Sequence, residues 1–422
     1  MLKKIPVAQL RLGMHLHALE GSWIDHPFWK SRFTLRDPVD LRRLREGAVA
    51  ECWIDVSKGL DVASADTEVR PRPPAAPPIA PPAPAPAPAL APAPSPRPPT
   101  RSMDEELRQA AAVCNRGREA VESMFREARM GRAVDTEGCL PLVSEITESV
   151  IRHPGAMVSL ARLKTKDEYS YMHSVAVCAL MVSLARHLGL DEAECREAGV
   201  AGLMHDIGKA VIPLDILNKP GKLTDAEFAT VRTHPERGHM MLVEGRGATD
   251  GVLDVCLHHH ERVDGTGYPR RLSGDALTRI ARMGAICDVY DAITSNRPYK
   301  MGWDPAESIA RMASWKGHFD PTLFQAFVRS LGIYPVGSLV ALASGRLAVV
   351  MEQNPQSLTT PVVKVFFSTK SQMPIPTQRV DLAASSSGDR IVGRESPAKW
   401  GFGFIDELWA DPEAIRARRA PA

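Results

Sequence analysis

The sequence predicts a mainly helical protein with a small mixed domain at its N-terminus and a small β-rich appendage at its C-terminus. Apolar residues recur at helical spacing from about residue 135 to 332, with short breaks between successive helices. After residue 334 the pattern changes to the alternation that is typical of strands. A stretch rich in proline and alanine separates both regions from the N-terminal segment. The 422 residues are enough for two or three domains with a sizeable core.

Composition excludes several classes of protein. The formal net charge of +2 gives no global field that would attract a nucleic-acid polymer or a membrane. The seven cysteines are scattered and never spaced Cys-x-x-Cys, which indicates reduced thiols in a reducing compartment. No signal-peptide core follows the first lysines, and the longest apolar run, 174–185, is too short to span a bilayer. We therefore expect a cytoplasmic protein without a membrane span.

Residues 1–62 are predicted to form an accessory domain of mixed structure. Residues 52–56 alternate like a strand, and a short helix is expected near 40–46. The aromatic side chains offered to its core are Trp23, Phe28, Trp29, Phe33 and Trp53.

Residues 63–101 are predicted to be a linker, because most of them are proline or alanine. Proline fixes φ and removes a backbone donor, so we expect a semi-rigid, polyproline-II-like spacer. Recognition by a proline-binding module is the alternative.

Residues 102–134 are predicted to be a connecting helix. Ser102 and Glu105 form a capping box, and an imperfect three-four apolar stripe runs to about Met130. We expect this stripe to pack on the next domain. Pairing with a second copy in a homodimer stays open.

The helices of residues 135–332 carry polar residues at their ends or on their inner faces. His173 shares a face with Val177 and Leu184, and Gly189 ends that helix. Asp191 with Glu194 caps the start of the next helix, and Thr224 with Glu227 caps the start of another. The second of these helices is expected to run to His234. The first of these two helices delivers His205 and Asp206 at its C-terminal end.

The adjacent residues His205 and Asp206 offer a neutral nitrogen and a hard carboxylate to one metal ion. This pair suits zinc, iron or manganese better than calcium, which prefers oxygen ligands. A single such dipeptide is more often structural, but further metal-ligand types lie at His173, His234, His258, His259, His260, Glu261, Asp288 and Asp291. Together they could enclose two metals, and Lys209 adds a cation where a phosphate could sit.

The last helix of this region places two carboxylates on one stripe. Gly284, Cys287, Asp288 and Asp291 lie at i, i+3, i+4 and i+7, so small residues leave room beside the acids. The alternative is a solvated helix face.

Residues 333–422 are predicted to be a β-rich extension. Alternating residues on both sides of Ser344-Gly345 predict a hairpin, and 361–367 a third strand. We expect 400–409 to pack back on these strands.

The central segment carries five sequence blocks in a fixed order. They are Tyr171-Met172-His173-Ser174-Val175, His205-Asp206-Ile207-Gly208-Lys209, His234-Pro235, His259-His260-Glu261-x-x-Asp264-Gly265-x-Gly267-Tyr268-Pro269 and Asp288-Val289-Tyr290-Asp291 with Arg297-Pro298-Tyr299-Lys300. Through these blocks the segment, from about residue 135 to 330, resembles the HD-GYP family of the HD phosphohydrolase superfamily. Residues 1–62 also resemble a small domain of unknown role that is often found ahead of HD-GYP domains.

The resemblance implies a phosphodiesterase that hydrolyses cyclic di-GMP to linear pGpG, with GMP as a further product. Such chemistry uses two divalent metals about 3.5–4 Å apart. The implied terminal ligands are His173, His205, His234, His259, His260 and Asp288. Asp206 would bridge the two metals, and a bridging water would be the nucleophile. Iron or manganese is expected on family grounds, and the mixed ligands are also compatible with zinc.

The resemblance also implies contacts with the substrate. Lys209, Arg297 and Lys300 would bind phosphates, and Lys209 is placed with Asp206 among the catalytic residues. Asp291 would orient a water or contact a guanine edge. The loop 264–269, with Tyr268, would border the site and contact GGDEF-type or other signalling domains; a simple glycine-permitted turn is the alternative.

One residue departs from the pattern of some family members. They carry a glutamate one turn before the first histidine, where it helps to hold a third metal. Tyr169 stands there in this chain, and Glu168 is out of phase, so two metals are expected. The rival functions are a non-catalytic cyclic di-GMP sensor or adaptor that acts through the GYP loop, and an HD phosphohydrolase for another nucleotide.

Overall fold

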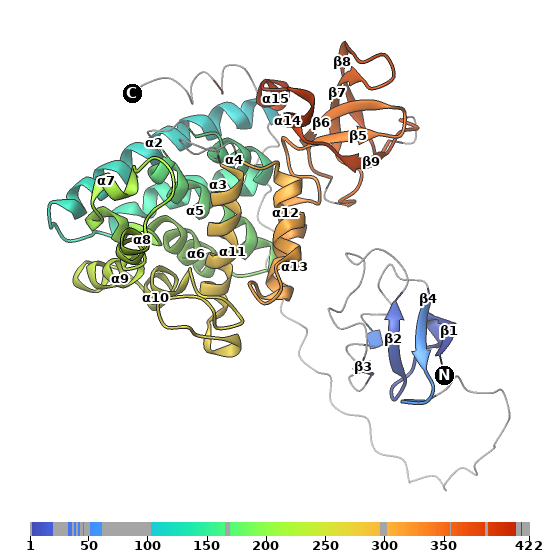
Figure 1. Cartoon of the computed structure of the whole chain (residues 1–422), viewed down its shortest axis with the longest axis horizontal. Coiled ribbons are helices and arrows are strands. Elements are labelled where there is room, and N and C mark those ends of the chain that lie inside the picture. The colour runs from blue at the N-terminus through green and yellow to red at the C-terminus, as the bar shows by residue number, and fades with distance from the viewer. Residues whose placement is uncertain are drawn as a thin grey trace, which may run out of the picture. The chain divides into compact units, whose positions relative to one another are not determined.

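The computed structural model divides the chain into two compact units, residues 1–97 and 98–422 (Figure 1). It describes residues 2–19, 33–35, 38, 41–42, 45, 51–60, 103–164, 169–295, 302–354, 356–384, 387–410 and 415. The predicted linker, most of the helix expected near 40–46, and the aromatic residues Trp23, Phe28 and Trp29 lie outside these residues.

The first unit is built on an antiparallel four-stranded sheet. Its strands, in the spatial order β1-β4-β2-β3, are β1 (Leu2–Pro6), β2 (His15–Leu19), β3 (Phe33–Thr34) and β4 (Glu51–Asp55), and the 3-10 turn η1 (Val7–Gln9) follows β1. The strand expected at 52–56 is therefore present, one residue earlier. The core of the described part is aliphatic, with Leu10, Leu16 and Ile54 fully buried, whereas Trp53 is only half-buried.

The second unit begins with the long helix α2 (Met103–Arg129). Acidic residues in its first turn and arginines in its last complement the helix dipole. Leu107, Cys114 and Val121 are buried against the helices that follow, so the expected packing on the next domain is confirmed. Ser102, the first residue of the predicted capping box, lies outside the described residues.

Helix α5 (Tyr169–His187) is the centre of the helical domain. Every side chain from 172 to 185 is buried, as expected of a helix that is surrounded by others. The helices around it are α2, α3 (Leu140–Arg152), α4 (Pro154–Arg162), α6 (Glu192–Met204), α11 (Arg279–Thr294) and α13 (Pro321–Leu331). The domain is completed by α7 (Leu214–Leu217), α8 (Asp225–Val231), α9 (His234–Glu244), α10 (Asp250–His258) and α12 (Pro305–Ser314), with the 3-10 turns η2 (Glu137–Cys139), η3 (Ile207–Val211) and η4 (Gly274–Ala276).

Local signals set most of these boundaries. Gly189 takes φ +73° after α5, and the capping boxes predicted for α6 and α8 are both formed. The prediction that α8 runs on to His234 was wrong. It ends at Val231, and His234 opens α9 with Pro235 in the first turn, where the missing N–H needs no partner.

A five-stranded antiparallel sheet packs against the helices. Its order is β8-β7-β6-β5-β9, with β5 (Leu339–Leu342), β6 (Arg346–Glu352), β7 (Val362–Ser368), β8 (Met373–Asp381) and β9 (Ile391–Arg394). The predicted hairpin and third strand are confirmed. The short helices α14 (Pro397–Trp400) and α15 (Ile405–Trp409) pack back as expected, and Trp409 joins the core of the helical domain.

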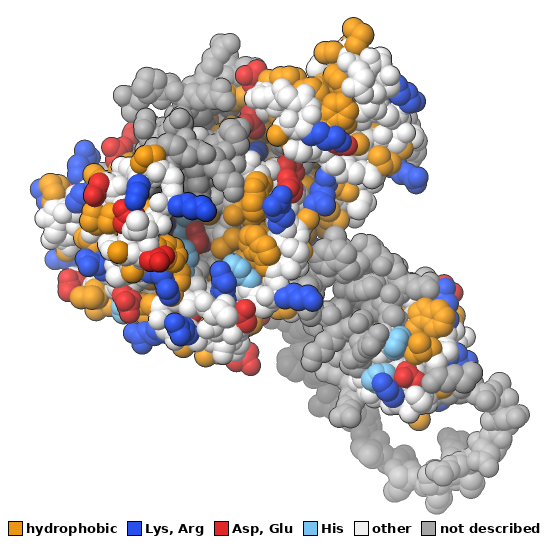
Figure 2. Space-filling model, viewed as in Figure 1, with side chains coloured by type: hydrophobic (Ala, Val, Ile, Leu, Met, Phe, Trp, Pro, Cys, Tyr) orange, Lys and Arg blue, Asp and Glu red, His pale blue; other side chains and the backbone are white. Residues whose placement is uncertain are grey.

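The surface agrees with the balanced composition. On the face shown in Figure 2, Lys and Arg side chains are interspersed with Asp and Glu over the helical domain. None of the described helices is long and apolar enough to cross a bilayer.

Candidate metal centre

Close packing of α6 on α5 brings the first two histidines together. A Cβ at Gly202 would lie 2.9 Å from the backbone of Cys178, so only glycine allows this approach. His205 follows as the C-terminal cap of α6, and its Nε2 lies 3.2 Å from Nε2 of His173 on α5.

One oxygen of Asp206 faces this first histidine group. Asp206 Oδ2 lies 3.5 Å from Nε2 of His173 and 3.4 Å from Nε2 of His205. On α11, Asp288 Oδ1 lies 3.0 Å from the same nitrogen of His173. The four side chains are almost fully buried. One ligand atom of each of His173, His205 and Asp206 lies within 4.8 Å of the others.

The other oxygen of Asp206 faces a second histidine group. Asp206 Oδ1 lies 3.1 Å from Nε2 of His234 and 3.6 Å from Nε2 of His259. His260 completes the group, since one atom of each of these four residues lies within 4.8 Å of the others. Nδ1 of His260 is also 3.5 Å from Asp288 Oδ2, which joins the two groups.

Bonds at the outer nitrogens fix the rings. Each of four histidines donates a hydrogen bond from its Nδ1. The acceptors are Gly202 O for His205 (2.8 Å), Val231 O for His234 (2.7 Å), Cys256 O for His259 (3.0 Å) and Asp291 Oδ2 for His173 (2.6 Å). A proton on Nδ1 leaves Nε2 with a lone pair, which is the form that binds metals. Four lone pairs therefore point toward the two oxygens of Asp206.

The chemistry of these residues fits the binding of divalent cations. The Nε2 pairs His173–His205 and His234–His259 face each other at 3.2 Å, and lone pairs repel at that distance without a cation. Asp206 Oδ1 is buried and has no hydrogen-bond donor among the described residues. A carboxylate can offer one oxygen to each of two metals, whereas a neutral imidazole has only one nitrogen with a free lone pair.

The charges of the group suit metal binding. Burial alone would raise the pKa of Asp206, but Lys209 and the histidines outweigh it and hold that pKa well below the usual range. Burial lowers the pKa of His234 to about 4, so this imidazole is neutral at pH 7. Asp206 and His234 are therefore in the deprotonated state that metals require. Burial lowers the pKa of His173, but its hydrogen bonds to Asp288 and Asp291 outweigh this and raise it.

The residues predicted to contact substrate are only partly described. Lys209 Nζ lies 2.5 Å from Asp206 Oδ2. The ring of Tyr268 lies 4.7 Å from that of His260. Arg297, Lys300 and Glu168, and the side chain of Tyr169, lie outside the described residues, so the phosphate contacts and the two-metal count stay predictions.

Asp291 lies behind His173. Its Oδ2 accepts from His173 Nδ1 and from the Nζ of Lys164, which also bonds Ser295 Oγ at 2.8 Å. Asp291 and Lys164 are almost fully buried. The predicted contact of Asp291 with substrate stays a prediction, while these contacts give it protein partners.

Sequence reasoning missed Lys164 and Arg232. Lys164 stands alone just after α4, and its partner Asp291 is far away in the sequence, so no local pattern marks it. Arg232 stacks its guanidinium 4.5 Å from the centre of the Tyr268 ring, beside His260. Its place two residues before His234 was the only sequence signal.

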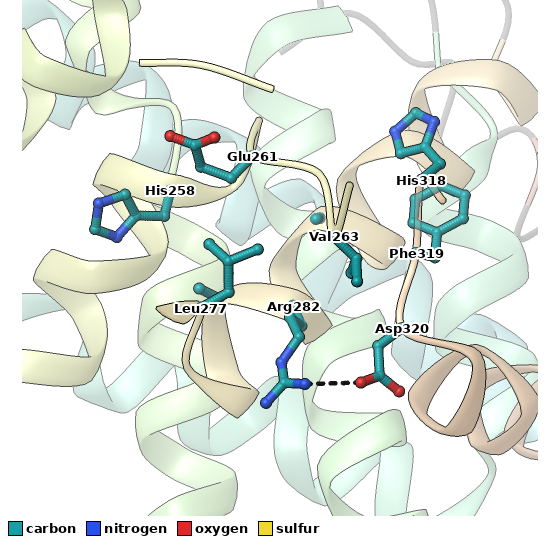
Figure 3. Close-up of a pocket in the computed structure, with 10 residues that line it drawn as sticks. His258, Glu261, Val263, Leu277, Arg282, His318, Phe319 and Asp320 are labelled. Carbon is teal, nitrogen blue, oxygen red and sulfur yellow. Dashed lines mark hydrogen bonds and ion pairs between the residues drawn. The ribbon is translucent and has the colours of Figure 1, made fainter. Parts of the chain in front are cut away.

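The GYP loop is a structured turn. Asp264 Oδ1 accepts from the N–H (2.9 Å) and hydroxyl (2.7 Å) of Thr266, and a Cβ at Gly267 would lie 2.4 Å from Glu261 Cα. Figure 3 shows Glu261 beside His258 in the lining of a small pocket, to which Val263 next to this loop also contributes. His258 Nδ1 bonds Asp254 at 2.7 Å, so this ring has a protein partner outside the metal-ligand groups.

Comparisons with known proteins agree with this geometry. The chain matches the HD domain family over residues 146–323 and a domain of unknown function (DUF3391) over residues 2–139. It is 58% identical, over 97% of its length and 96% of the relative, to cyclic di-GMP phosphodiesterase PA4108 of Pseudomonas aeruginosa.

Two further relatives match a part of the chain. Cyclic di-GMP phosphodiesterase response regulator RpfG of Xanthomonas campestris is 42% identical over 40% of this chain and 47% of its own length. 3'3'-cGAMP-specific phosphodiesterase 1 of Vibrio cholerae is 36% identical over 42% of this chain and 41% of its own. As the motifs predicted, the chain belongs to the HD-GYP family and carries the domain of unknown function ahead of its HD domain.

Proposed function

We propose that the protein is a metal-dependent phosphodiesterase that hydrolyses cyclic di-GMP. The observation that carries this proposal is Asp206, whose two oxygens each face a separate histidine group. The similarity to a protein named as a cyclic di-GMP phosphodiesterase, which extends over nearly the whole chain, supports the choice of substrate.

The chain's own residues would prepare the site for this reaction. Divalent cations held here would supply Lewis acidity and positive charge at the phosphoryl group. The histidines and Asp288 would hold those cations, and their Nδ1 bonds keep the rings in place without rearrangement. Lys209 keeps Asp206 ionised and lies near enough to contact a phosphate oxygen.

Arg232 and Tyr268 are proposed as further substrate contacts. Arg232 lies over the ring of Tyr268, and Tyr268 lies beside the ring of His260. The cationic side chain of Arg232 is thus one ring away from a predicted metal ligand. A guanidinium can bind a phosphate with two parallel hydrogen bonds. Arg297 and Lys300 keep the phosphate-binding role that the family resemblance gives them.

The first product should be linear pGpG, because one ester bond opens the ring, and a second cleavage would give GMP. Iron or manganese are the proposed metals, and the nitrogen and oxygen ligands also suit zinc. We propose a cytoplasmic location, which is supported by the seven free thiols. Contacts of the GYP loop with GGDEF-type domains, and a homodimer, remain proposals.

Two rival functions differ in what they predict. A non-catalytic sensor would be favoured by missing ligands, but all seven predicted ligands are brought together here. A preference for 3'3'-cGAMP is favoured by the similarity to the Vibrio cholerae enzyme with that name.

The test is anaerobic purification with metal analysis, followed by incubation with cyclic di-GMP or 3'3'-cGAMP and chromatography of the products. We expect about two metals per chain and faster formation of pGpG than of the product from cGAMP. Tight binding of cyclic di-GMP without turnover, after loading with iron and with manganese, would establish the sensor function instead.

A further inference from the structure

A cavity of about 390 Å³ lies between the helical domain and the C-terminal sheet. Its walls come from the start of α4, the end of α13 and the end of β6, and Tyr290 of α11 closes one side. None of the predicted metal ligands lines it. Its volume is in the range of cavities that bind small molecules.

Basic side chains line this cavity and acidic ones do not. The basic residues in its wall are Arg152, His153, Arg162, His187 and Arg329. Arg152 is neutralised from outside by Glu106, which accepts from its Nε at 2.9 Å and from its Nη2 at 3.2 Å. Arg162 forms a looser ion pair, since Asp406 Oδ1 lies 3.7 Å from its Nη2, and this nitrogen makes no hydrogen bond to the described residues.

Three buried polar atoms in the wall have no hydrogen-bond partner among the described residues. They are Arg162 Nη2, His153 Nδ1 and Gln353 Oε1. An unbonded buried polar atom costs about 1–3 kcal/mol, so three around one cavity call for an explanation. The guanidinium can only donate, the amide oxygen can only accept, and the imidazole can do either.

Apolar residues form the rest of the wall. Val158, Pro335, Val336 and Leu358 line it, and Gly155 leaves room where a Cβ would lie 3.2 Å from Val336 and 3.8 Å from Nδ1 of His153. The cavity therefore combines an apolar body with a cation and a hydrogen-bond acceptor.

We infer that this cavity is a second ligand site, which binds a small organic anion. The ligand would place a phosphate or carboxylate on Arg162 and His153, give an N–H or O–H to Gln353 Oε1, and pack its body on Val158 and Leu358. A guanidinium recognises both anions in the same geometry, so the two sources are separated by experiment.

The experiment is isothermal titration calorimetry of the metal-loaded full chain with two probes, GMP for the phosphate source and 4-hydroxybenzoate for the carboxylate source. At least one probe should bind. Arg162→Gln should weaken that binding about tenfold or more, because a charge-assisted hydrogen bond is lost. Val158→Phe should weaken it by filling the cavity without changing any charge.

Arg116→Gln is the matched control, since Arg116 pairs with Glu145 on the exposed face of α2. Its affinity for the probe should equal that of the wild type. Val158→Phe separates this cavity from product binding at the metals, because a probe held only at the metals would bind that variant as tightly as the wild type. The inference fails if neither probe binds, or if a folded Arg162→Gln or Val158→Phe protein binds as tightly as wild type. If Arg162→Gln does not fold, Val158→Phe decides. Turnover of cyclic di-GMP is measured separately and bears only on the proposed function.

Discussion

Two carboxylates of the second unit, Asp206 in the metal centre and Asp304 at the junction with the C-terminal sheet, have pKa values shifted in opposite directions. In the metal centre, Lys209 and the histidines keep the pKa of Asp206 well below its usual range although burial raises it. At the junction with the C-terminal sheet, burial raises the pKa of Asp304 to about 6, although hydrogen bonds from backbone N–H groups and the charge of Arg162 lower it. Asp206 is almost fully buried and Asp304 only half-buried, so the more deeply buried acid is the one whose partners keep it charged.

The comparison separates a functional from a structural buried acid. Asp206 stays ionised because cations surround it, and it has lone pairs left for metals. Asp304 caps α12, where it accepts from Ala306 and Glu307, and it also accepts from Leu339 of β5. A lowered pKa beside unfilled lone pairs thus indicates a metal site better than burial does.

Removal of Asp206 should have the largest effect, because both histidine groups depend on it. Asp206→Ala is expected to lower turnover of cyclic di-GMP by about 1,000-fold or more and to abolish binding of two metals. Metal analysis and product chromatography check this. The control is Asp275→Ala, in the turn η4, which should keep both. Normal turnover with a full metal content in Asp206→Ala would refute the shared-carboxylate site.

Much of this site could be predicted because its signals are local. The spacing of His173 on an apolar face, the capping boxes of α6 and α8, and the stripe of Asp288 and Asp291 each depend on neighbours in the sequence. The HD-GYP motifs then joined these separate pieces. Domain boundaries inside residues 98–422 remain predictions, since the helices and the sheet share one hydrophobic core.

The missed features depend on contacts between distant segments. Strand β8 was not predicted because most of its side chains are exposed and Pro374 and Pro376 interrupt its pattern, as an edge strand allows. The role of Lys164 depends on its ion pair with Asp291, which lies far away in the sequence on α11. The cavity beside Arg162 exists only where the sheet meets α4 and α13.

Substitution of Lys164 should have the next largest effect. It tests whether Lys164 keeps the buried carboxylate of Asp291 ionised behind the metal centre. Burial raises the pKa of Asp291, and Lys164 with His173 lowers it. Lys164→Met leaves that carboxylate with a histidine alone, so we expect a loss of about 3–5 kcal/mol in the free energy of unfolding. Metal affinity of the His173 group should fall about 10–100-fold, because Asp291 orients that ring.

Chemical denaturation and metal titration of Lys164→Met check both expectations. Lys219→Met is the matched control, because Lys219 pairs with Glu227 in a partly exposed salt bridge. Such a pair contributes about 0–1 kcal/mol. Equal losses of stability in the two variants would show that burial of the pair at Asp291 has no special weight.

Substitution of Asp304 should have the smallest effect, and it should raise the free energy of unfolding at pH 7 instead of lowering it. Its pKa of about 6 in the folded state lies above the unfolded value of 3.8, so the native protein keeps a proton that the unfolded chain releases. This contribution to stability is present below about pH 4 and is lost as the pH rises to about 6.

Asp304→Asn keeps an acceptor for the helix cap and removes the charge. It should therefore raise the free energy of unfolding at pH 7 by about 1–3 kcal/mol, with the gain shrinking toward pH 4. Denaturation curves at pH 4, 5.5 and 7 check this, and Asp320→Asn is the control, because Asp320 caps α13 but pairs with Arg282. The control should show no gain at pH 7, since it loses an ion pair. If Asp304→Asn were destabilised at pH 7, the backbone donors at Asp304 would outweigh its burial, as Lys209 and the histidines do at Asp206.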